Sequence, residues 1–389
     1  MAKIKAFKAT LPQPHWFNEI LKNEEQGLFD LRYCLEARGS LKIDQRNRDE
    51  IILKLNQLMD EKLFENDLYQ CIYLYGQQTG DKTTYGFCML TDVADYEDQD
   101  IHKHEKTILE KQARLTDYRK YIGIEGSPVL LIHRPHWRLN EIIADITLQS
   151  APLIYDHAAQ THYIWRIIDV EIIEEITELF TRIGNVYIGD GHHRLASAAA
   201  SKSITKPYIN SLYVATNQLK ISAFNRLVFP SEPLDKECFF QHIKKYFFVS
   251  PVPGNIPYKP DRLHRLGLCF KGEWYQLDVK PALMELVQLP DVIIIQDKIL
   301  DELLGISDPQ SAENLFYYPE SAFAEMLEDG ATSLDSIILT VFSLSMNKLM
   351  EMAEDGKFLP PKSSYIDPKI PFGLLMNIQA LIARDDCVV

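Results

Sequence analysis

The run Asn185-Val-Tyr-Ile-Gly-Asp-Gly-His-His-Arg-Leu-Ala-Ser-Ala-Ala-Ala200 decides how the middle of this chain is expected to fold. Its apolar beginning, residues 186–188, is typical of a β-strand, and its alanine-rich end is typical of a helix. Gly189, Asp190 and Gly191 stand between the two and predict a tight turn. The stretch therefore predicts a strand, a turn and the start of a helix, in that order.

Four polar side chains are concentrated at this turn, and they predict a phosphate- or nucleotide-binding site formed with Gly191: Asp190, His192, His193 and Arg194. Backbone N–H groups at a helix N-terminus lack intrahelical partners and carry partial positive charge, so they bind phosphate readily. Arg194 adds a fork of donors, and Asp190 adds a carboxylate that can hold Mg²⁺ or accept a proton. The alternative is structural: Asp190 caps the helix, Arg194 is its ion-pair partner and the histidines are surface residues.

Composition narrows the class of protein. The 389 residues are 46% apolar, which is enough for two or three domains with real cores. Their net charge is 41 − 55 = −14, which disfavours general nucleic-acid binding. No apolar run is long enough to span a bilayer, and the N-terminus lacks a signal-peptide pattern. We therefore expect a soluble cytoplasmic protein with a small-molecule substrate and no membrane partner.

The cysteines are scattered and form no CxxC pair, which predicts reduced, mostly buried thiols rather than disulfides or a zinc site. They are Cys34, Cys71, Cys88, Cys238, Cys269 and Cys387.

Apolar periodicity predicts an α+β fold. The first half contains an amphipathic helix over 44–64, a hairpin of 70–75 with 84–90, a helix capped by Asp169, and a strand over 207–216. The second half contains a hairpin of 266–270 with 274–279, helical spacing at 295–303 and 323–327, a strand over 337–342 and a helix over 346–353. We place a domain boundary near residue 225, between a domain of residues 1–225 and one of residues 226–389.

Two further segments concentrate reactive groups. In Ile101-His-Lys-His-Glu-Lys-Thr107, Glu105 is a candidate general base tuned by His104 or Lys106. In the segment 359–371, four prolines stiffen a loop that carries lysines and hydroxyls suited to an anionic substrate. The alternatives are a solvated loop for the first segment and a surface connector for the second. The common nucleotide-binding and hydrolase motifs GxxxxGK[ST], GxGxxG and GxSxG are absent from the sequence.

These segments resemble the hallmarks of a large bacterial and archaeal family, the domain of unknown function numbered one thousand and fifteen. The matching motifs are His104-Glu-Lys-Thr107, His162-Tyr-Ile-Trp-Arg166, Asp190-Gly-His-His-Arg194 and Pro360-Pro-Lys-Ser-Ser-Tyr-Ile-Asp-Pro-Lys369. The resemblance covers nearly the whole chain from about residue 70. The sequence departs from the family where Lys106 replaces an arginine and where Asn225 and Gln296 stand in place of common histidines.

The resemblance implies a ParB/sulfiredoxin-like mixed α/β catalytic domain, with an α+β C-terminal region that completes the pocket. The family looks related to free L-serine kinases, so it also implies phosphoryl transfer. Glu105 would deprotonate the acceptor hydroxyl, and Asp190 would bind Mg²⁺ or assist. The helix N-terminus with His192, His193 and Arg194 would neutralise the donor oxygens. The implied substrate-binding residues are His104, Thr107, Arg166, Lys362, Ser363, Ser364 and Tyr365.

The expected function is therefore Mg²⁺-dependent phosphoryl transfer between L-serine or O-phosphoserine and ADP, ATP or pyrophosphate, in either direction or as hydrolysis. A non-catalytic regulator that binds a nucleotide or phosphometabolite stays open, and so does a homo-oligomer. A ParB-like DNA-binding protein is a third alternative, which the net charge of −14 disfavours.

Overall fold

The computed structural model of this protein describes residues 2–18, 45–157, 159–202 and 207–378. By internal contacts the chain divides into two compact units, each described by itself below. The first unit comprises Met1–Lys103, Thr107–Leu219 and Pro368–Val389, and the second comprises His104–Lys106 and Lys220–Asp367. A division into units by contacts does not show which parts of the chain fold independently. The predicted domain boundary near residue 225 therefore stays a prediction.

The first unit is built on a mixed sheet, in which β11 pairs in parallel with β6, and β12 with β8. The other pairs are antiparallel. In spatial order the strands are β6 (Ile101–His102), β11 (Val186–Asp190), β8 (Val129–His133), β12 (Tyr208–Ala215), β5 (Lys82–Asp92), β4 (Ile72–Thr79), β10 (Gln160–Ile167) and β9 (Leu153–His157), with β1 (Ile4–Lys5) beside β5. This arrangement confirms the α+β class.

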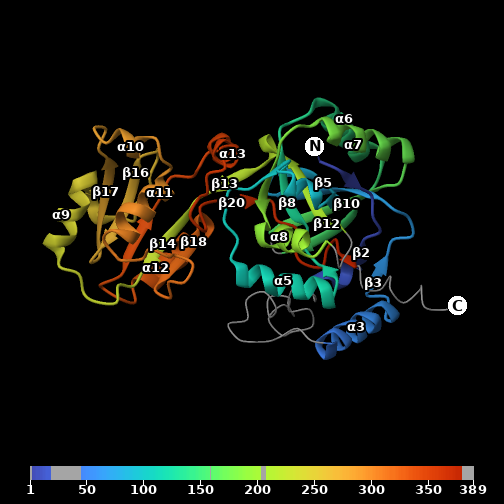
Figure 1. The fold of residues 1–389 in the computed structure, drawn as a ribbon, viewed down its shortest axis with the longest axis horizontal. Coiled ribbons are helices and arrows are strands. Elements are labelled where there is room, and N and C mark those ends of the chain that lie inside the picture. Colours follow the sequence, from blue (N-terminus) through green and yellow to red (C-terminus); the bar gives the residue numbers. More distant parts are fainter. Residues whose placement is uncertain (1, 19–44, 158, 203–206, 379–389) are drawn as a thin grey trace. The chain divides into compact units, whose positions relative to one another are not determined.

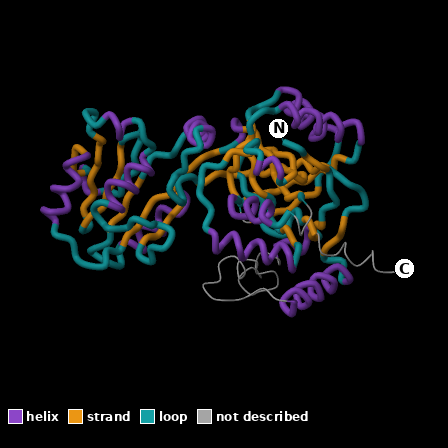
Figure 2. The backbone as a smooth tube through the Cα atoms, viewed as in Figure 1, coloured by secondary structure: helices purple, strands orange, loops and turns teal. Residues whose placement is uncertain are grey.

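Helices flank this sheet (Figures 1 and 2). On one side lie α6 (Trp137–Gln149) and α7 (Val170–Arg182). Phe180 of α7 packs against Phe87 and Tyr213 of the sheet. On the other side α5 (Leu109–Tyr121) packs against α8 (His192–Ala200). The predicted cap of α7 is confirmed, because the Asp169 carboxylate accepts the backbone N–H groups of Glu171 and Ile172.

The remaining predicted elements of this unit are also present. The predicted hairpin is β4 with β5, the predicted strand after the alanine-rich helix is β12, and the first predicted helix is α3 (Gln45–Asp60). Smaller elements are β2 (Thr10–Pro12), η1 (Pro14–Trp16), β3 (Phe64–Asn66), α4 (Ala94–Glu97), β7 (Ile124–Glu125), η3 (Thr216–Gln218) and β21 (Asn377–Ile378).

The second unit contains an antiparallel sheet (Figure 2). Its strand order is β15 (Phe247–Pro251), β17 (Glu273–Val279), β16 (Arg265–Phe270), β19 (Ile337–Thr340), β14 (Phe224–Val228) and β18 (Leu315–Pro319). The predicted hairpin is β16 with β17, and the predicted strand over 337–342 is β19. A separate pair joins β13 (Lys220–Ser222) to β20 (Tyr365–Asp367).

Helices of the second unit are α9 (Lys236–Tyr246), η4 (Pro253–Asn255), α10 (Met284–Val287), α11 (Asp291–Ile295), η5 (Gln296–Asp301), η6 (Glu320–Ala322), α12 (Phe323–Gly330) and α13 (Met346–Glu354). The prediction of regular helical spacing over 295–303 is wrong in part, because α11 gives way to the π-helical η5 and the helix ends at Asp301. A core of Leu227, Trp274, Met326 and Ile338 lies between α12 and the sheet.

The prediction for cysteines is confirmed in part. Cys71 and Cys88 are buried thiols, Cys269 is half-buried and Cys238 is exposed. Cys34 and Cys387 lie outside the described residues. None of the described helices has both the length and the apolarity needed to cross a membrane.

Candidate functional site

The corner where β11 meets α8 carries the quoted motif. The strand continues through Asp190 with a register shift at Gly189, so the predicted three-residue turn is wrong. Gly191 alone separates the strand from the helix. Its φ is 92°, a left-handed conformation that favours glycine. Gly191 also occupies the N-cap of α8, so Asp190 is not the helix cap.

Asp190 and Arg194 form the ion pair of the structural alternative. Arg194 Nη2 donates to Asp190 Oδ2 at 2.8 Å, while Nη1 donates to the carbonyl oxygens of Ser127 and Pro128 at 2.6 and 2.9 Å. Lys369 Nζ lies 3.5 Å from the other oxygen, Asp190 Oδ1. Two cations against one carboxylate leave a net charge of about +1 in this cluster, which favours an anionic ligand.

The cluster of Asp190, Arg194 and Lys369 lines a cavity of about 340 Å³. This volume falls in the range of small-molecule sites. The remaining lining residues are mainly apolar: Leu115, Tyr118, Arg119, Ile124, Glu125, Gly126, Ser127, Pro128, Leu130, Ser197, Ile209, Leu212, Pro368, Ile370 and Phe372. A wall of this kind, with a few convergent charges, suits a ligand that has both an apolar body and an anionic group.

A buried ion pair between Arg119 and Glu125 also borders the cavity. Burial lowers the pKa of Arg119 to about 10, which leaves it charged at neutral pH. Glu125 Oε2 also accepts the backbone N–H of Asn210 at 2.9 Å and the side-chain amide of Asn377 at 2.8 Å. Because these partners satisfy the pair, it holds the wall in place rather than attracting an anion.

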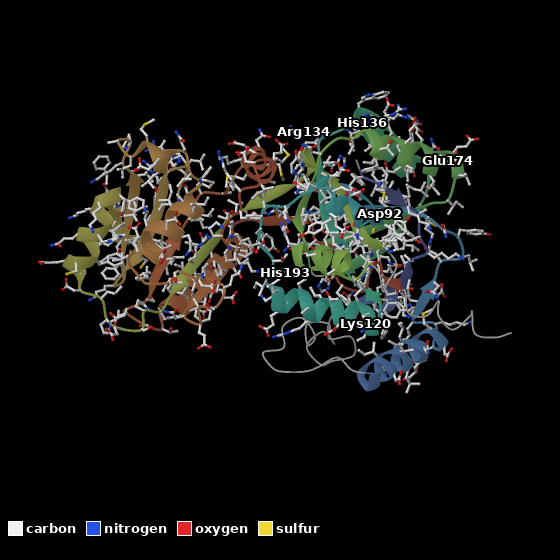
Figure 3. The ribbon with its side chains drawn as sticks, in the orientation of Figure 1. Asp92, Lys120, Arg134, His136, Glu174 and His193 are labelled. Carbon is white, nitrogen blue, oxygen red and sulfur yellow. The ribbon has the colours of Figure 1, made fainter. Side chains whose placement is uncertain are left out.

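The two histidines of the motif lie at the start of α8. His193 Nε2 accepts the backbone N–H of Ile108 at 2.9 Å and so joins the starts of α8 and α5 (Figure 3). A backbone N–H only donates, so Nε2 carries no proton in this arrangement. His192 is buried, with 5% of its surface exposed. Thr107 precedes this contact and donates from Oγ1 to Gln112 Oε1 at 3.3 Å.

The structure does not bring Arg166 to Asp190. Arg166 lies on β10, and four strands separate β10 from β11, which corresponds to roughly 24 Å at about 4.8 Å per strand. Its Nε donates to Asp67 Oδ1 at 2.6 Å, and Tyr73 donates to Asp67 Oδ2 at 2.7 Å. Arg166 therefore holds the segment before β4, away from Asp190, and its substrate-binding role stays a prediction.

Two predicted segments lie side by side in the second unit. Glu105 bridges Leu359 in parallel register, and the Leu359 N–H donates to the carbonyl oxygen of His104 at 2.8 Å. The negative charge of Glu105 contributes to raising the pKa of Tyr317, after the larger effect of burial. His104 is buried, with 2% of its surface exposed.

The proline-rich segment is ordered by its own contacts. Ser363 Oγ donates to the Pro360 carbonyl oxygen at 2.6 Å. The Phe224 ring lies 5.5 Å from the Tyr365 ring and 5.4 Å from Lys362 Nζ. Ser364 is half-buried beside them. The predicted residues thus form two groups: Asp190, Gly191, His192, His193, Arg194 and Thr107 in the first unit, and His104, Glu105 and 362–365 in the second.

Sequence reasoning missed part of the cavity wall. The lysines of the segment 359–371 are predicted to suit an anionic substrate, but the sequence does not place Lys369 beside Asp190, and it does not single out the loop of Gly126, Ser127 and Pro128. A Gly-Ser-Pro turn directly before the apolar strand β8 was a signal for a loop at that sheet edge. Phe372 carried no signal, because its contact with Gly126 depends on the fold.

Asp190 is the candidate ligand for Mg²⁺. In the part of the chain that the structure describes, no group of three His, Cys, Asp or Glu side chains could hold a metal ion. Mg²⁺ commonly binds through one or two carboxylates plus substrate phosphates and waters. The Asp190 carboxylate therefore fits Mg²⁺ that arrives with a phosphorylated ligand, and not a cage of protein ligands.

A family model described as protein of unknown function, DUF1015, matches residues 34–302, more than half of the chain. The chain belongs to the DUF1015 family. No curated protein matches it.

Among solved structures, a mutant free serine kinase in complex with AMP has 14% identity and a TM-score of 0.39, covering 72% of this chain and 88% of that chain. A complex of that kinase with ADP has 15% sequence identity and a TM-score of 0.39, covering 72% of this chain and 89% of that chain. SbnI from Staphylococcus aureus, truncated at its C-terminus, has 12% sequence identity and a TM-score of 0.42, covering 77% of this chain and 90% of that chain. Likenesses this weak carry no function across to this chain.

Proposed function

We propose that this protein is a Mg²⁺-dependent phosphotransferase that acts on a small hydroxyl substrate. The acceptor is free L-serine, with ADP, ATP or pyrophosphate as donor, and the reaction also runs from O-phosphoserine. The proposal includes a ParB/sulfiredoxin-like fold for residues 1–225 and an α+β region over residues 226–389. The resemblance of its motifs to those of the DUF1015 family, whose model matches residues 34–302, supports this proposal.

One observation carries the proposal. A cavity of about 340 Å³ has largely apolar walls, and at its charged side Asp190 lies between Arg194 and Lys369. An apolar body such as a nucleobase suits the walls, and a phosphate suits the surplus positive charge beside the start of α8. Phosphoryl transfer depends mainly on positioning and on neutralising charge, which are the properties that this cluster supplies.

The residues have separate roles in this proposal. Arg194 and Lys369 bind phosphate oxygens, and the N–H groups at the start of α8 add to that field. Mg²⁺, bound through Asp190 and the phosphates, would neutralise charge on the transferred group. Glu105 accepts the proton of the acceptor hydroxyl, a role that is carried by the shared family motif.

The test follows O-phosphoserine by phosphorus NMR in a mixture of pure protein, Mg²⁺, L-serine and ADP, ATP or pyrophosphate. A parallel series starts from O-phosphoserine. We expect turnover by the wild type and a loss of at least a hundredfold in D190A and in E105A, because positioned charge and general-base groups contribute about 10²–10⁴-fold.

The matched control is E178Q, which removes an exposed carboxylate from α7, on the side of the sheet opposite α8. It should turn over like the wild type. Full activity in both D190A and E105A would reject the assigned roles, and no turnover with any donor would reject the phosphotransferase.

One observation favours a second candidate, a nucleotide-binding regulator without chemistry. Asp190 already faces a cation at each oxygen, Arg194 at 2.8 Å and Lys369 at 3.5 Å, and these cations compete with Mg²⁺ for the carboxylate. Nucleotide binding without turnover of any hydroxy-amino acid would favour this candidate.

A further inference from the structure

The last described segment of the chain, residues 368–378, forms one wall of the cavity, and we name it the C-terminal strap. The Gly373 N–H donates to the Gly126 carbonyl oxygen at 2.9 Å, and the Met376 N–H donates to that of Thr10 at 3.1 Å. The side chain of Asn210 donates to the Leu375 carbonyl oxygen at 2.8 Å. These bonds fix the backbone of the strap against the first unit.

Packing fixes the same segment near Lys369. Pro368 and Ile370 on either side of it are buried. The Phe372 ring covers Gly126 so closely that a Cβ there would fall 1.7 Å from it. The Lys369 side chain remains 42% exposed and lines the cavity. A fixed backbone with an exposed flexible side chain allows the ammonium to move without moving the strap.

The two cations beside Asp190 are held differently. Arg194 is anchored by two backbone carbonyls as well as by Asp190. Lys369 meets Asp190 at 3.5 Å, where both side chains are 42% exposed. Ion pairs this exposed contribute little to stability, so the ammonium can exchange one anion for another at low cost. A lysine is also a mobile point charge, in contrast to the rigid fork of arginine.

We propose that Lys369 is the specificity-determining cation of this cavity. Its ammonium leaves Asp190 for the outermost phosphate of the ligand, so the site selects ligands by phosphate charge. Arg194 stays in place and sets the position of the inner phosphate. This inference rests on the proposed function, because it requires a phosphorylated ligand in the cavity.

The test is calorimetric titration with ADP, AMP and pyrophosphate in EDTA, which removes any metal contribution. We compare the wild type with K369M, which keeps an unbranched apolar side chain but removes the charge. Binding of ADP and of pyrophosphate should weaken at least tenfold in K369M, and binding of AMP should weaken less. Comparing ADP with pyrophosphate shows whether a nucleotide or a free polyphosphate is the source of the charge.

The matched control is K111M, which removes an exposed lysine from α5, a helix that lines the cavity through other residues. K111M should bind all three ligands like the wild type. Thermal melting of both variants should match the wild type, because neither lysine is buried.

A second variant tests the exchange of partners. D190N removes the anion that competes for Lys369, so ADP should bind several-fold more tightly than to the wild type in EDTA. That gain should disappear in D190N/K369M. A purely structural role for Lys369 would not make D190N strengthen ADP binding while K369M weakens it.

The outcomes separate the two proposals. If the wild type binds ADP and K369M binds it equally well, the role of Lys369 is overturned while the proposed function stands. If K369M loses the same affinity for AMP as for ADP, the proposed selection of ligands by phosphate charge is also overturned. If the wild type binds none of the three ligands in EDTA, the inference about Lys369 fails, and the turnover assay with Mg²⁺ decides the proposed function separately.

Discussion

Gly191 is the residue on which the geometry of the corner depends. Its φ of 92° is costly for any L-residue, and a Cβ there would lie 2.9–3.1 Å from the guanidinium of Arg194. Glycine therefore serves both the backbone and the close approach of Arg194 to Asp190.

We predict that G191A loses about 1–2 kcal/mol of unfolding free energy from its backbone conformation and also binds ADP more weakly. Arg194 has to move away from the added methyl group, so the anion loses a positioned donor. Urea unfolding and calorimetric titration measure the two effects.

Gly184 provides the control for G191A. It too has a positive φ, 82°, but a Cβ there would meet nothing within 4 Å. G184A should lose a similar amount of stability and keep its affinity for ADP. A parallel loss of affinity in G184A would show that ligand binding follows stability and not the position of Arg194.

At the scale of elements, the loop before β8 and the C-terminal strap hold each other in place. A Cβ on Gly126 would overlap the Phe372 ring at 1.7–2.6 Å, so G126A must displace the ring. We predict a loss of about 1–3 kcal/mol from overpacking and faster hydrogen exchange across residues 373–377.

The double variant G126A/F372A tests this mechanism. Removing the ring removes the clash, so the double variant should be no less stable than F372A alone. Additive losses would mean that Gly126 matters for a reason other than the ring.

Local elements could be predicted from the sequence because their signals are local. The hairpin of β4 and β5, the capped helix α7 and the strand β12 follow from periodicity and turn residues. The order of strands could not be predicted, since pairing such as β8 with β12 joins residues about 80 positions apart.

The same limit applies to the candidate site. The neighbourhood of Asp190 and Arg194 could be predicted from the motif, because the two lie only four positions apart, across the turn from β11 to α8. The approach of Lys369 to Asp190 required the strap to return to the first unit. The separation of Arg166 from Asp190 could not be predicted for the converse reason: a motif assigns a residue to a family segment but does not say which strands separate it from the others.

At the scale of the whole molecule, burial shifts the pKa of an aspartate in the second unit and of two histidines in the first. In the second unit, burial raises the pKa of Asp291 to about 7, although the backbone N–H of His264 at 2.9 Å opposes this shift. In the first unit, burial lowers the pKa of His133 and of His162 to about 4 each. Asp95, whose pKa is raised by burial, opposes the histidines in that unit.

These shifts have opposite consequences for stability. The folded state binds a proton on Asp291 that the unfolded state has released, so the second unit loses stability as pH rises from about 4 to 7. The unfolded state protonates His133 and His162 below their ordinary pKa of 6.5, while the folded state does not, so the first unit loses stability as pH falls from 6.5 toward 4.

We therefore predict that raising the pH from 5 to 7 stabilises β4 and β5 while it destabilises β16 and β17, by about 2 kcal/mol for each buried group. Native-state hydrogen exchange, corrected for the intrinsic effect of pH on exchange, measures each pair of strands in the same sample. D291N should abolish the change in β16 and β17 only, because its amide does not titrate, and H162Q should reduce the change in β4 and β5 only. If both sheets shift together in the wild type, the two units unfold as one cooperative body. The opposite effects of Asp291 and of the two histidines on stability then cancel within a single unfolding transition.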